Sequence, residues 1–176
     1  SILPIVSSSD GSLTKVLLEV FENFPEFNVA KKIYLYETSI LLRNLQKKNI
    51  KNRNINWIKN FKNINDGPVI FFGNEFFDAI PIKQFKNNKG SLFEKYYAFD
   101  KEVQIKEIFK KASKQDSSEI NSYKSLKKLK FVEFPKYGFE ELKKIIKKIV
   151  KLQGCLLLID YGYTKPSNQN TLQSVM

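Results

Sequence analysis

Short apolar runs that alternate with segments of helical periodicity constrain the fold of this 176-residue chain more than any other feature. Three runs have the length and composition of buried strands: 33–36, 69–72 and 155–159. Apolar residues at helical spacing predict three helices: over 12–24, from Ser39 onward, and from Phe139 to Gly154. This alternation is typical of a parallel sheet covered by helices, so we expect an α/β, doubly wound fold.

The predicted helices have stripes that we expect to face the sheet. The stripe of the first helix is Leu13, Val16, Leu17, Val20 and Phe21, and that of the second is Leu41, Leu42 and Leu45. Ser12 and Ser39 are suited to cap these two helices. Cys155 opens the last apolar run, so we expect it in the core.

The region from 80 to 130 has a different character. Aromatic-rich segments over 80–85, 92–99 and 103–109 are separated by turn residues and predict an antiparallel meander. The polar stretch 114–125 predicts a loop that leads into a short helix. We therefore expect one domain over 1–176 with a β-rich insertion at 80–130. The chain begins with Ser instead of Met and ends at Met176 without a tail, so we expect a fold truncated at both ends.

The composition excludes several kinds of site. With no His and one Cys, a zinc site has almost no ligands to draw on, and there is no base for Ser-His or Cys-His chemistry. We expect no metal site. The 30 Lys and Arg residues against 18 Asp and Glu give a formal net charge of +12, but only Arg43 and Arg53 supply a guanidinium. Because nucleic-acid surfaces favour arginine, we expect no nucleic-acid partner and a solvated lysine surface.

The apolar runs and the cysteine count also indicate the surroundings of the chain. The run 155–159 is far too short to span a bilayer, so we expect no stable membrane insertion. A single cysteine excludes a disulfide framework and favours a reduced, cytoplasmic protein. The oligomeric state is left open.

Acidic residues follow the predicted strands. Glu37, Glu75 and Asp160 each come directly or shortly after an apolar run, and Asp78 follows Glu75 by three residues. Ligands of parallel sheets bind beyond the carboxyl ends of the strands, and an acid after the second strand can accept hydrogen bonds from both hydroxyls of a ribose. The alternative is that each strand ends in a polar residue simply because it reaches solvent.

The segment from Gly73 to Pro81 is the most specific string in the chain. Its two carboxylates and one amide, next to two aromatics, suit a cation such as a guanidinium, an amine or a sulfonium. The alternative is a turn in which Asp78 caps the backbone while Phe76 and Phe77 pack inward.

This string, Asn74-Glu-Phe-Phe-Asp-Ala-Ile-Pro81, closely resembles the MidA-like class I S-adenosylmethionine-dependent methyltransferases. Further segments resemble other family motifs in the same order along the chain: Asp10-Gly-Ser-Leu13, Tyr36-Glu37, Gln84-Phe85, Val132-Glu133, Leu158–Tyr163 and Thr171–Val175. The resemblance covers essentially the whole chain.

The resemblance implies a class I methyltransferase fold, S-adenosylmethionine as cofactor, and methylation of a protein substrate. That substrate is implied to be an arginine on a subunit of respiratory complex I. By the same resemblance, the residues that hold the cofactor are Asp10, Gly11, Ser12, Glu37 and Asn74. Asn74, Glu75 and Asp78 would face the transferred methyl and the incoming nitrogen, and Asp160 and Tyr161 would bind the substrate.

One motif departs from the family pattern. Where the family has an acid, a leucine and a Gly-Pro-Gly turn, this chain has Ile5-Val-Ser-Ser-Ser9. Serine adopts positive φ far less readily than glycine, so the first motif is degenerate or the first nine residues are an artefact. The alternative function is therefore a non-catalytic assembly or binding module that keeps the methyltransferase fold.

Overall fold

The structure is a computed structural model that describes all residues except 1, 8–9, 52–53, 100–103, 166–167 and 172–176. The chain forms two compact units. The first comprises Ser1–Ile80 and Phe139–Tyr161, and the second comprises Pro81–Gly138 and Gly162–Met176. No helix in the described part of the chain has the length and apolar character that crossing a bilayer requires.

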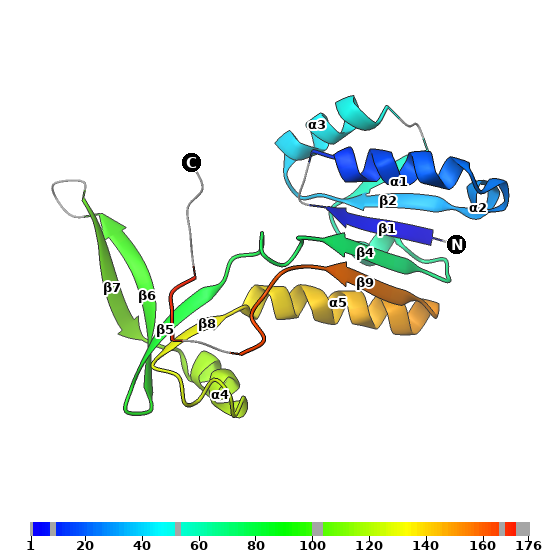
Figure 1. Ribbon diagram of the computed structural model, residues 1–176. Coiled ribbons are helices and arrows are strands. Elements are labelled where there is room, and N and C mark those ends of the chain that lie inside the picture. Colours follow the sequence, from blue (N-terminus) through cyan, green and yellow to red (C-terminus); the bar gives the residue numbers. More distant parts are fainter. Residues whose placement is uncertain (1, 8–9, 52–53, 100–103, 166–167, 172–176) are drawn as a thin grey trace. The chain divides into compact units, whose positions relative to one another are not determined.

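The first unit contains a five-stranded parallel sheet in the order β3-β2-β1-β4-β9 (Figure 1). Its strands are β1 (Ile2–Ser7), β2 (Lys32–Tyr36), β3 (Ile55–Ile58), β4 (Ile70–Asn74) and β9 (Cys155–Ile159). Every pairing is parallel, so the carboxyl ends of all five strands lie at one edge of the sheet. The expectation of an α/β fold is confirmed.

Helices cover both faces of this sheet. They are α1 (Ser12–Glu22), α2 (Pro25–Ala30), α3 (Ile40–Ile50) and α5 (Lys136–Leu152), with a 3-10 turn η1 at Phe61–Asn63. Alternate strand residues point to opposite faces. Helices α1 and α3 lie on one face and α5 on the other (Figure 1). Ile33 and Leu35 pack with Leu18 of α1 and Ile50 of α3, whereas Phe71 packs with Ile145 of α5.

The helix limits agree with the sequence better than the buried stripes do. The Ser39 hydroxyl accepts a hydrogen bond from the Leu42 amide (3.3 Å), as expected, but the N-cap of α1 is Gly11 and not Ser12. The stripe predicted for α3 is wrong in part: Leu41 is 79% exposed and Leu45 is exposed, whereas Leu42 is partly buried. Gln46 and Ile50 are the buried residues of this helix. Hydrophobic periodicity assigns the polar residue Gln46 to the surface, and this shifts the predicted buried face of the helix.

The stripe predicted for α1 is also wrong in part. Thr14 and Leu18 are its buried residues, while Val16 and Val20 are about half exposed.

Strand β9 is an edge strand, which corrects a second prediction. It pairs with β4, and on its other side no described strand is paired with it. Leu157 is therefore 53% exposed, and Cys155 is exposed instead of lying in the core. An apolar run indicates a strand, but it does not show whether that strand has neighbours on both sides.

The second unit contains an antiparallel sheet in the order β7-β6-β5-β8. Its strands are β5 (Lys83–Asn88), β6 (Ser91–Phe99), β7 (Ile105–Lys111) and β8 (Phe131–Phe134). The antiparallel pairing of β5, β6 and β7 confirms the expected meander.

Helix α4 (Lys114–Ser122) contradicts the loop predicted over 114–125. It begins at the N-cap Ser113, whose hydroxyl accepts a hydrogen bond from the Asp116 amide (3.0 Å). Asp116 and Ile120, four residues apart, form its buried side. Because the segment is mostly polar, its sequence did not predict this buried side.

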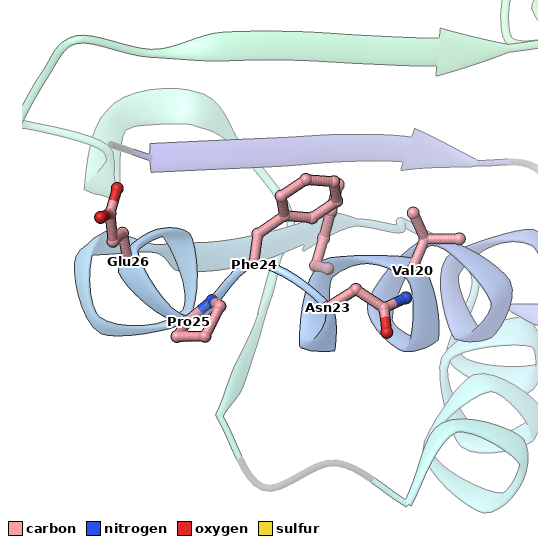
Figure 2. A pocket seen from close by; sticks show the side chains of 6 residues that line it. Val20, Asn23, Phe24, Pro25 and Glu26 are labelled. Atoms are coloured by element: carbon pink, nitrogen blue, oxygen red, sulfur yellow. The ribbon is translucent and has the colours of Figure 1, made fainter.

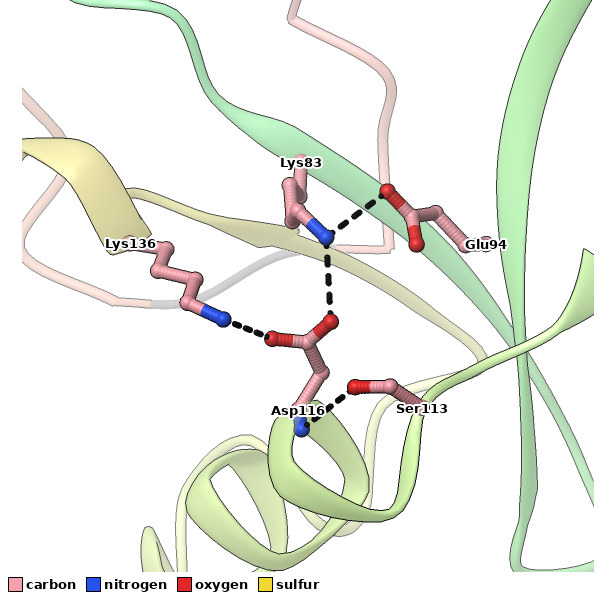
Figure 3. Close-up of polar contacts among 5 residues, drawn as sticks. All are labelled: Lys83, Glu94, Ser113, Asp116 and Lys136. Atoms are coloured by element: carbon pink, nitrogen blue, oxygen red, sulfur yellow. Dashed lines mark hydrogen bonds and ion pairs between the residues drawn. The ribbon is translucent and has the colours of Figure 1, made fainter.

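A buried ionic network joins α4 to the sheet of the second unit (Figure 3). Asp116, 1% exposed, receives Lys83 Nζ at 3.0 Å and Lys136 Nζ at 2.6 Å, and Lys83 Nζ also contacts Glu94 at 3.0 Å. Burial alone would raise the pKa of Asp116, but the hydrogen bonds from Lys136 and Lys83 outweigh it and lower the pKa to about 2.

Candidate functional site

The residues predicted for the site lie at the carboxyl edge of the parallel sheet in the first unit. Asp10 and Gly11 follow β1, Glu37 follows β2, Asn74 ends β4 and Asp160 follows β9. Because the strands are parallel, residues far apart in sequence are delivered to the same edge.

The turn between β1 and α1 requires glycine at position 11. Gly11 has φ of 92°, and a Cβ built there would lie 2.9 Å from Ile50 Cδ1. Before it, Asp10 Oδ1 accepts a hydrogen bond from the Ser12 amide (3.0 Å), which lowers the pKa of Asp10. Asn49 Nδ2 donates to the Asp10 carbonyl oxygen (3.1 Å), so α3 supports this turn.

Residues 7–9, where the first motif departs from the family, are only partly described. Ser7 is the last residue of β1 and lies opposite Asn74 of β4. Ser8 and Ser9 lie outside the described residues.

The Glu37 carboxylate is buried and held at both oxygens. It is 7% exposed; Oε1 accepts from the Ser39 amide (2.7 Å) and Oε2 accepts from Gln46 Nε2 (3.3 Å). Its backbone is fixed as well, because Arg43 Nη2 donates to its carbonyl oxygen (2.6 Å). Each carboxylate oxygen can accept two hydrogen bonds, and among the described residues one donor to each oxygen is seen.

Several residues that support Glu37 were missed by the sequence argument. Gln46 is 1% exposed, and its Oε1 accepts from Trp57 Nε1 (3.1 Å). Arg43 and Asn49 also contact predicted site residues. The signal that was available is the spacing of Leu42, Gln46 and Ile50, which places a polar residue on the core-facing side of a helix.

The segment after β4, which we call the acidic turn (residues 74–80), is more exposed. Asn74 is half-buried, whereas Glu75 and Asp78 are exposed. Glu75 has φ of 47°, and its amide donates to the Ile159 carbonyl oxygen (2.9 Å). Positive φ is uncommon for a residue with a side chain and costs of order 1 kcal/mol.

Asp160 and Tyr161 lie beside this turn, as the sequence led us to expect. Asp160 Oδ2 accepts from the Phe77 amide (3.3 Å), and the Tyr161 hydroxyl donates to Asp78 Oδ2 (2.8 Å). The hydrogen bond to Asp78 and the nearby negative charge raise the pKa of Tyr161.

Two aromatic contacts show what lies behind the acidic turn. The Phe76 ring packs edge-on to Tyr36, 6.1 Å between centroids, and Phe77 contacts Phe76. The inward packing expected for a simple turn therefore occurs together with the clustered carboxylates.

The chemistry of this edge fits a nucleoside with a cationic group. Glu37 offers two acceptor positions for neighbouring hydroxyls, and Gly11 keeps the backbone beside it clear of a side chain. Thr14, in the first turn of α1, is fully buried, and its hydroxyl has no hydrogen-bond partner among the described residues. No group of three or more Asp, Glu, Cys or His in the described sequence is arranged to hold a metal ion.

A separate pocket lies at the other end of α1 (Figure 2). Its volume is about 540 Å³, and it is lined by Val20, Phe21, Asn23, Phe24, Pro25 and Glu26. Helix α1 is roughly 16 Å long at 1.5 Å per residue, so this pocket is well removed from Gly11. It is not part of the site at the strand ends.

Comparison with known families gives one match over most of the chain. Residues 8–176 match the family described as "Putative S-adenosyl-L-methionine-dependent methyltransferase". Among curated proteins, 133 residues are 29% identical to the protein arginine methyltransferase NDUFAF7 homolog, mitochondrial, of Caenorhabditis elegans. That alignment covers 69% of this chain and 29% of the relative.

Two crystal structures from Burkholderia thailandensis share the fold. One, bound to S-adenosyl-homocysteine, is 14% identical with a TM-score of 0.66, and covers 92% of this chain and 42% of its own. The other, without a named ligand, is 13% identical with a TM-score of 0.69, and covers 92% and 43%. The chain therefore spans less than half the length of each of these similar proteins.

Proposed function

We propose that this chain, which belongs to the S-adenosyl-L-methionine-dependent methyltransferase family, transfers a methyl group from that cofactor to a protein side chain. The sequence motifs imply S-adenosylmethionine as cofactor, and the description of the matching family names the same cofactor. The alignment covers only 29% of the C. elegans relative, so the methyltransferase activity of the complete protein is itself proposed.

The observation that carries the proposal is the Glu37 carboxylate. It is buried and fixed at both oxygens by neutral donors, and each oxygen can accept a hydrogen bond beyond the one that the described residues donate to it. It lies at the carboxyl edge of a parallel sheet, where nucleosides bind in folds of this class.

The residues at this edge divide into two groups. Glu37 would accept the two ribose hydroxyls, and Asp10, Gly11, Ser12 and Asn74 would line the rest of the cofactor. When bound, S-adenosylmethionine supplies a methyl group attached to a positively charged sulfur.

The acidic turn would hold the substrate. Glu75 and Asp78 are carboxylates suited to orient a guanidinium, and Asp160 and Tyr161 line the same rim. The Tyr161 hydroxyl fixes Asp78 from one side. Holding the acceptor nitrogen in line and close is expected to provide most of the rate enhancement.

Arginine is the proposed acceptor residue. It is supported by the name of the C. elegans relative, a protein arginine methyltransferase, and by the acidic character of the turn. The family resemblance adds a respiratory complex I subunit as the proposed protein substrate. The cytoplasmic location expected from the composition stays a prediction.

The proposed function also implies a more specific fold than a parallel sheet covered by helices. We propose that the first unit is the doubly wound core of a class I methyltransferase and that 80–130 is an insertion within a single domain, 1–176. The order β3-β2-β1-β4-β9, with helices on both faces, supports this assignment.

The test is transfer of a labelled methyl group from S-adenosylmethionine to a complex I subunit, with methylarginine identified after hydrolysis. Glu75→Gln should lower turnover roughly 100-fold and leave S-adenosylhomocysteine affinity within about twofold, because Glu75 acts on the acceptor. Glu22→Gln, an exposed change on α1, is the matched control. Equal loss of turnover and affinity in Glu75→Gln would contradict the role of Glu75, and binding without transfer by the unchanged chain would favour the non-catalytic module.

A further inference from the structure

We propose that Gln46 is a positioning residue for the ribose of the cofactor, acting through Glu37. This inference rests on the proposed function, because it needs Glu37 to bind ribose. Gln46 lies on α3 and is 1% exposed, so it cannot contact bulk solvent and acts through its protein neighbours.

The amide of Gln46 is held in one orientation. Trp57 Nε1 is only a donor and lies 3.1 Å from Gln46 Oε1. Glu37 Oε2 accepts from Gln46 Nε2 at 3.3 Å. A rotated amide would place donor against donor and acceptor against acceptor. Trp57 therefore fixes Gln46, and Gln46 in turn fixes Glu37.

The hydrogen bond from Gln46 restricts the rotation of the Glu37 carboxylate. Oε1 is already held by the Ser39 amide at 2.7 Å, which alone would allow the group to rotate about that contact. The bond from Gln46 to Oε2 removes that rotation. Both remaining acceptor positions are then presented in a fixed direction, as recognition of two neighbouring hydroxyls requires.

Gln46 also lies against the turn that precedes α1. A Cβ built on Gly11 would be 3.2 Å from Gln46 Cγ, so the side chain passes directly beneath this glycine. One buried residue thus supports both the Gly11 turn and the Glu37 carboxylate, the two parts of the edge assigned to the cofactor.

Glutamine is a costly choice for a position that only fills the core. A buried amide is tolerated only when its polar atoms are paired, and leucine or methionine would fill the same space without that requirement. The amide of Gln46 pairs with both Trp57 and Glu37, and the bond to Glu37 sets the orientation of the carboxylate. Gln46 therefore helps Glu37 to select ligands whose ribose has both hydroxyls.

The experiment compares two ligands on three chains. S-adenosylhomocysteine and its 2′,3′-dideoxy analogue are titrated by calorimetry into the unchanged chain, Gln46→Met and Asn44→Met. Methionine keeps the length of glutamine and removes the hydrogen bonds to Glu37 and Trp57, and Asn44 is an exposed position on the same helix. Thermal unfolding checks that each variant is folded.

Gln46→Met should weaken S-adenosylhomocysteine binding about tenfold, because one charge-assisted hydrogen bond that orients Glu37 is lost. Binding of the dideoxy analogue should change by less than about twofold, since that ligand lacks the hydroxyls that Glu37 recognises. Asn44→Met should change neither affinity. A merely structural role would weaken both ligands alike, and that result would overturn the inference.

A second, milder variant keeps the inference testable if Gln46→Met does not fold. Trp57→Phe retains an aromatic ring and removes the donor to Gln46 together with part of the indole ring, so it should weaken S-adenosylhomocysteine by about two- to threefold and spare the analogue. Unchanged affinity for S-adenosylhomocysteine in both variants would overturn the role of Gln46 and leave the proposed function intact. Failure of the unchanged, folded chain to bind S-adenosylhomocysteine would contradict the proposed function and the inference together.

Discussion

Glu37 in the first unit and Asp116 in the second are both buried carboxylates, and they differ in the charge of the groups that donate hydrogen bonds to them. Asp116, 1% exposed, is bound by the ammonium groups of Lys83 and Lys136 (Figure 3). Glu37, 7% exposed, is bound by an amide N–H and by the side-chain amide of Gln46, both uncharged.

On the basis of this difference we assign a structural role to Asp116 and propose a binding role for Glu37. The charge of Asp116 is compensated within the protein, so its hydrogen bonds stabilise the attachment of α4 to the sheet. The charge of Glu37 is oriented by dipoles and keeps acceptor positions for a ligand. Burial alone does not distinguish the two, but the identity of the donors does.

The largest effect should come from Asp116→Asn. Removing the charge leaves Lys136 without its partner in the network and Lys83 with Glu94, and breaking a buried pair costs about 3 kcal/mol. Denaturant unfolding should show this loss, while S-adenosylhomocysteine affinity stays unchanged. A loss of affinity equal to that of a Glu37 variant would remove the distinction between the two acids.

Glu37→Gln should have the opposite profile. One oxygen becomes an NH₂ donor that faces the ligand hydroxyls or the existing donors, so S-adenosylhomocysteine affinity should fall about 30-fold, or roughly 2 kcal/mol. Calorimetric titration measures the effect, with Glu22→Gln as an exposed control. An affinity within twofold of the unchanged chain would show that Glu37 does not bind the cofactor.

The pH dependence of stability should also show the ion pairing of Asp116. The pKa of Asp116 is about 2 in the folded chain against a usual 3.8, so its contribution is present above about pH 4 and is lost as pH falls toward 2. The loss is roughly 2 kcal/mol by the linkage between pKa and stability. Unfolding measured between pH 4 and 2 should be less acid-sensitive in Asp116→Asn; equal sensitivity of the two chains would contradict the assignment.

The smallest effect concerns Glu75, a third carboxylate that is exposed and has φ of 47°. Glu75→Gly should raise the free energy of unfolding by about 0.5–1 kcal/mol, because glycine adopts this conformation without strain. Methyl transfer should nevertheless fall as it does in Glu75→Gln. A less stable variant would show that the Glu75 side chain contributes to the fold.

The sequence predicted the strands and their ends well, because apolar runs and the acids that follow them are local signals. Glu37, Asn74 and Asp160 lie at one edge since parallel pairing brings strand ends together. The exposure of Cys155 could not be predicted, because β9 looks the same in sequence whether or not another strand lies beside it.

The support around the site was not predicted for a related reason. Gln46 and Asp116 are polar residues on the buried sides of helices, and hydrophobic periodicity assigns such residues to the surface. Their partners are distant in sequence: Trp57 is 11 residues from Gln46, and Lys83 is 33 from Asp116. Only the folded arrangement shows that these amides and charges are paired.

The most direct test of the central claim is calorimetric titration of S-adenosylhomocysteine into the folded chain and into the same chain with Ser7→Gly and Ser9→Gly. The arrangement of Glu37 and Gly11 predicts saturable binding to a single class of sites in the unchanged chain, and binding at least as tight when the two glycines are present. Absence of binding in both folded proteins would contradict a cofactor site at the strand ends and would favour the non-catalytic module.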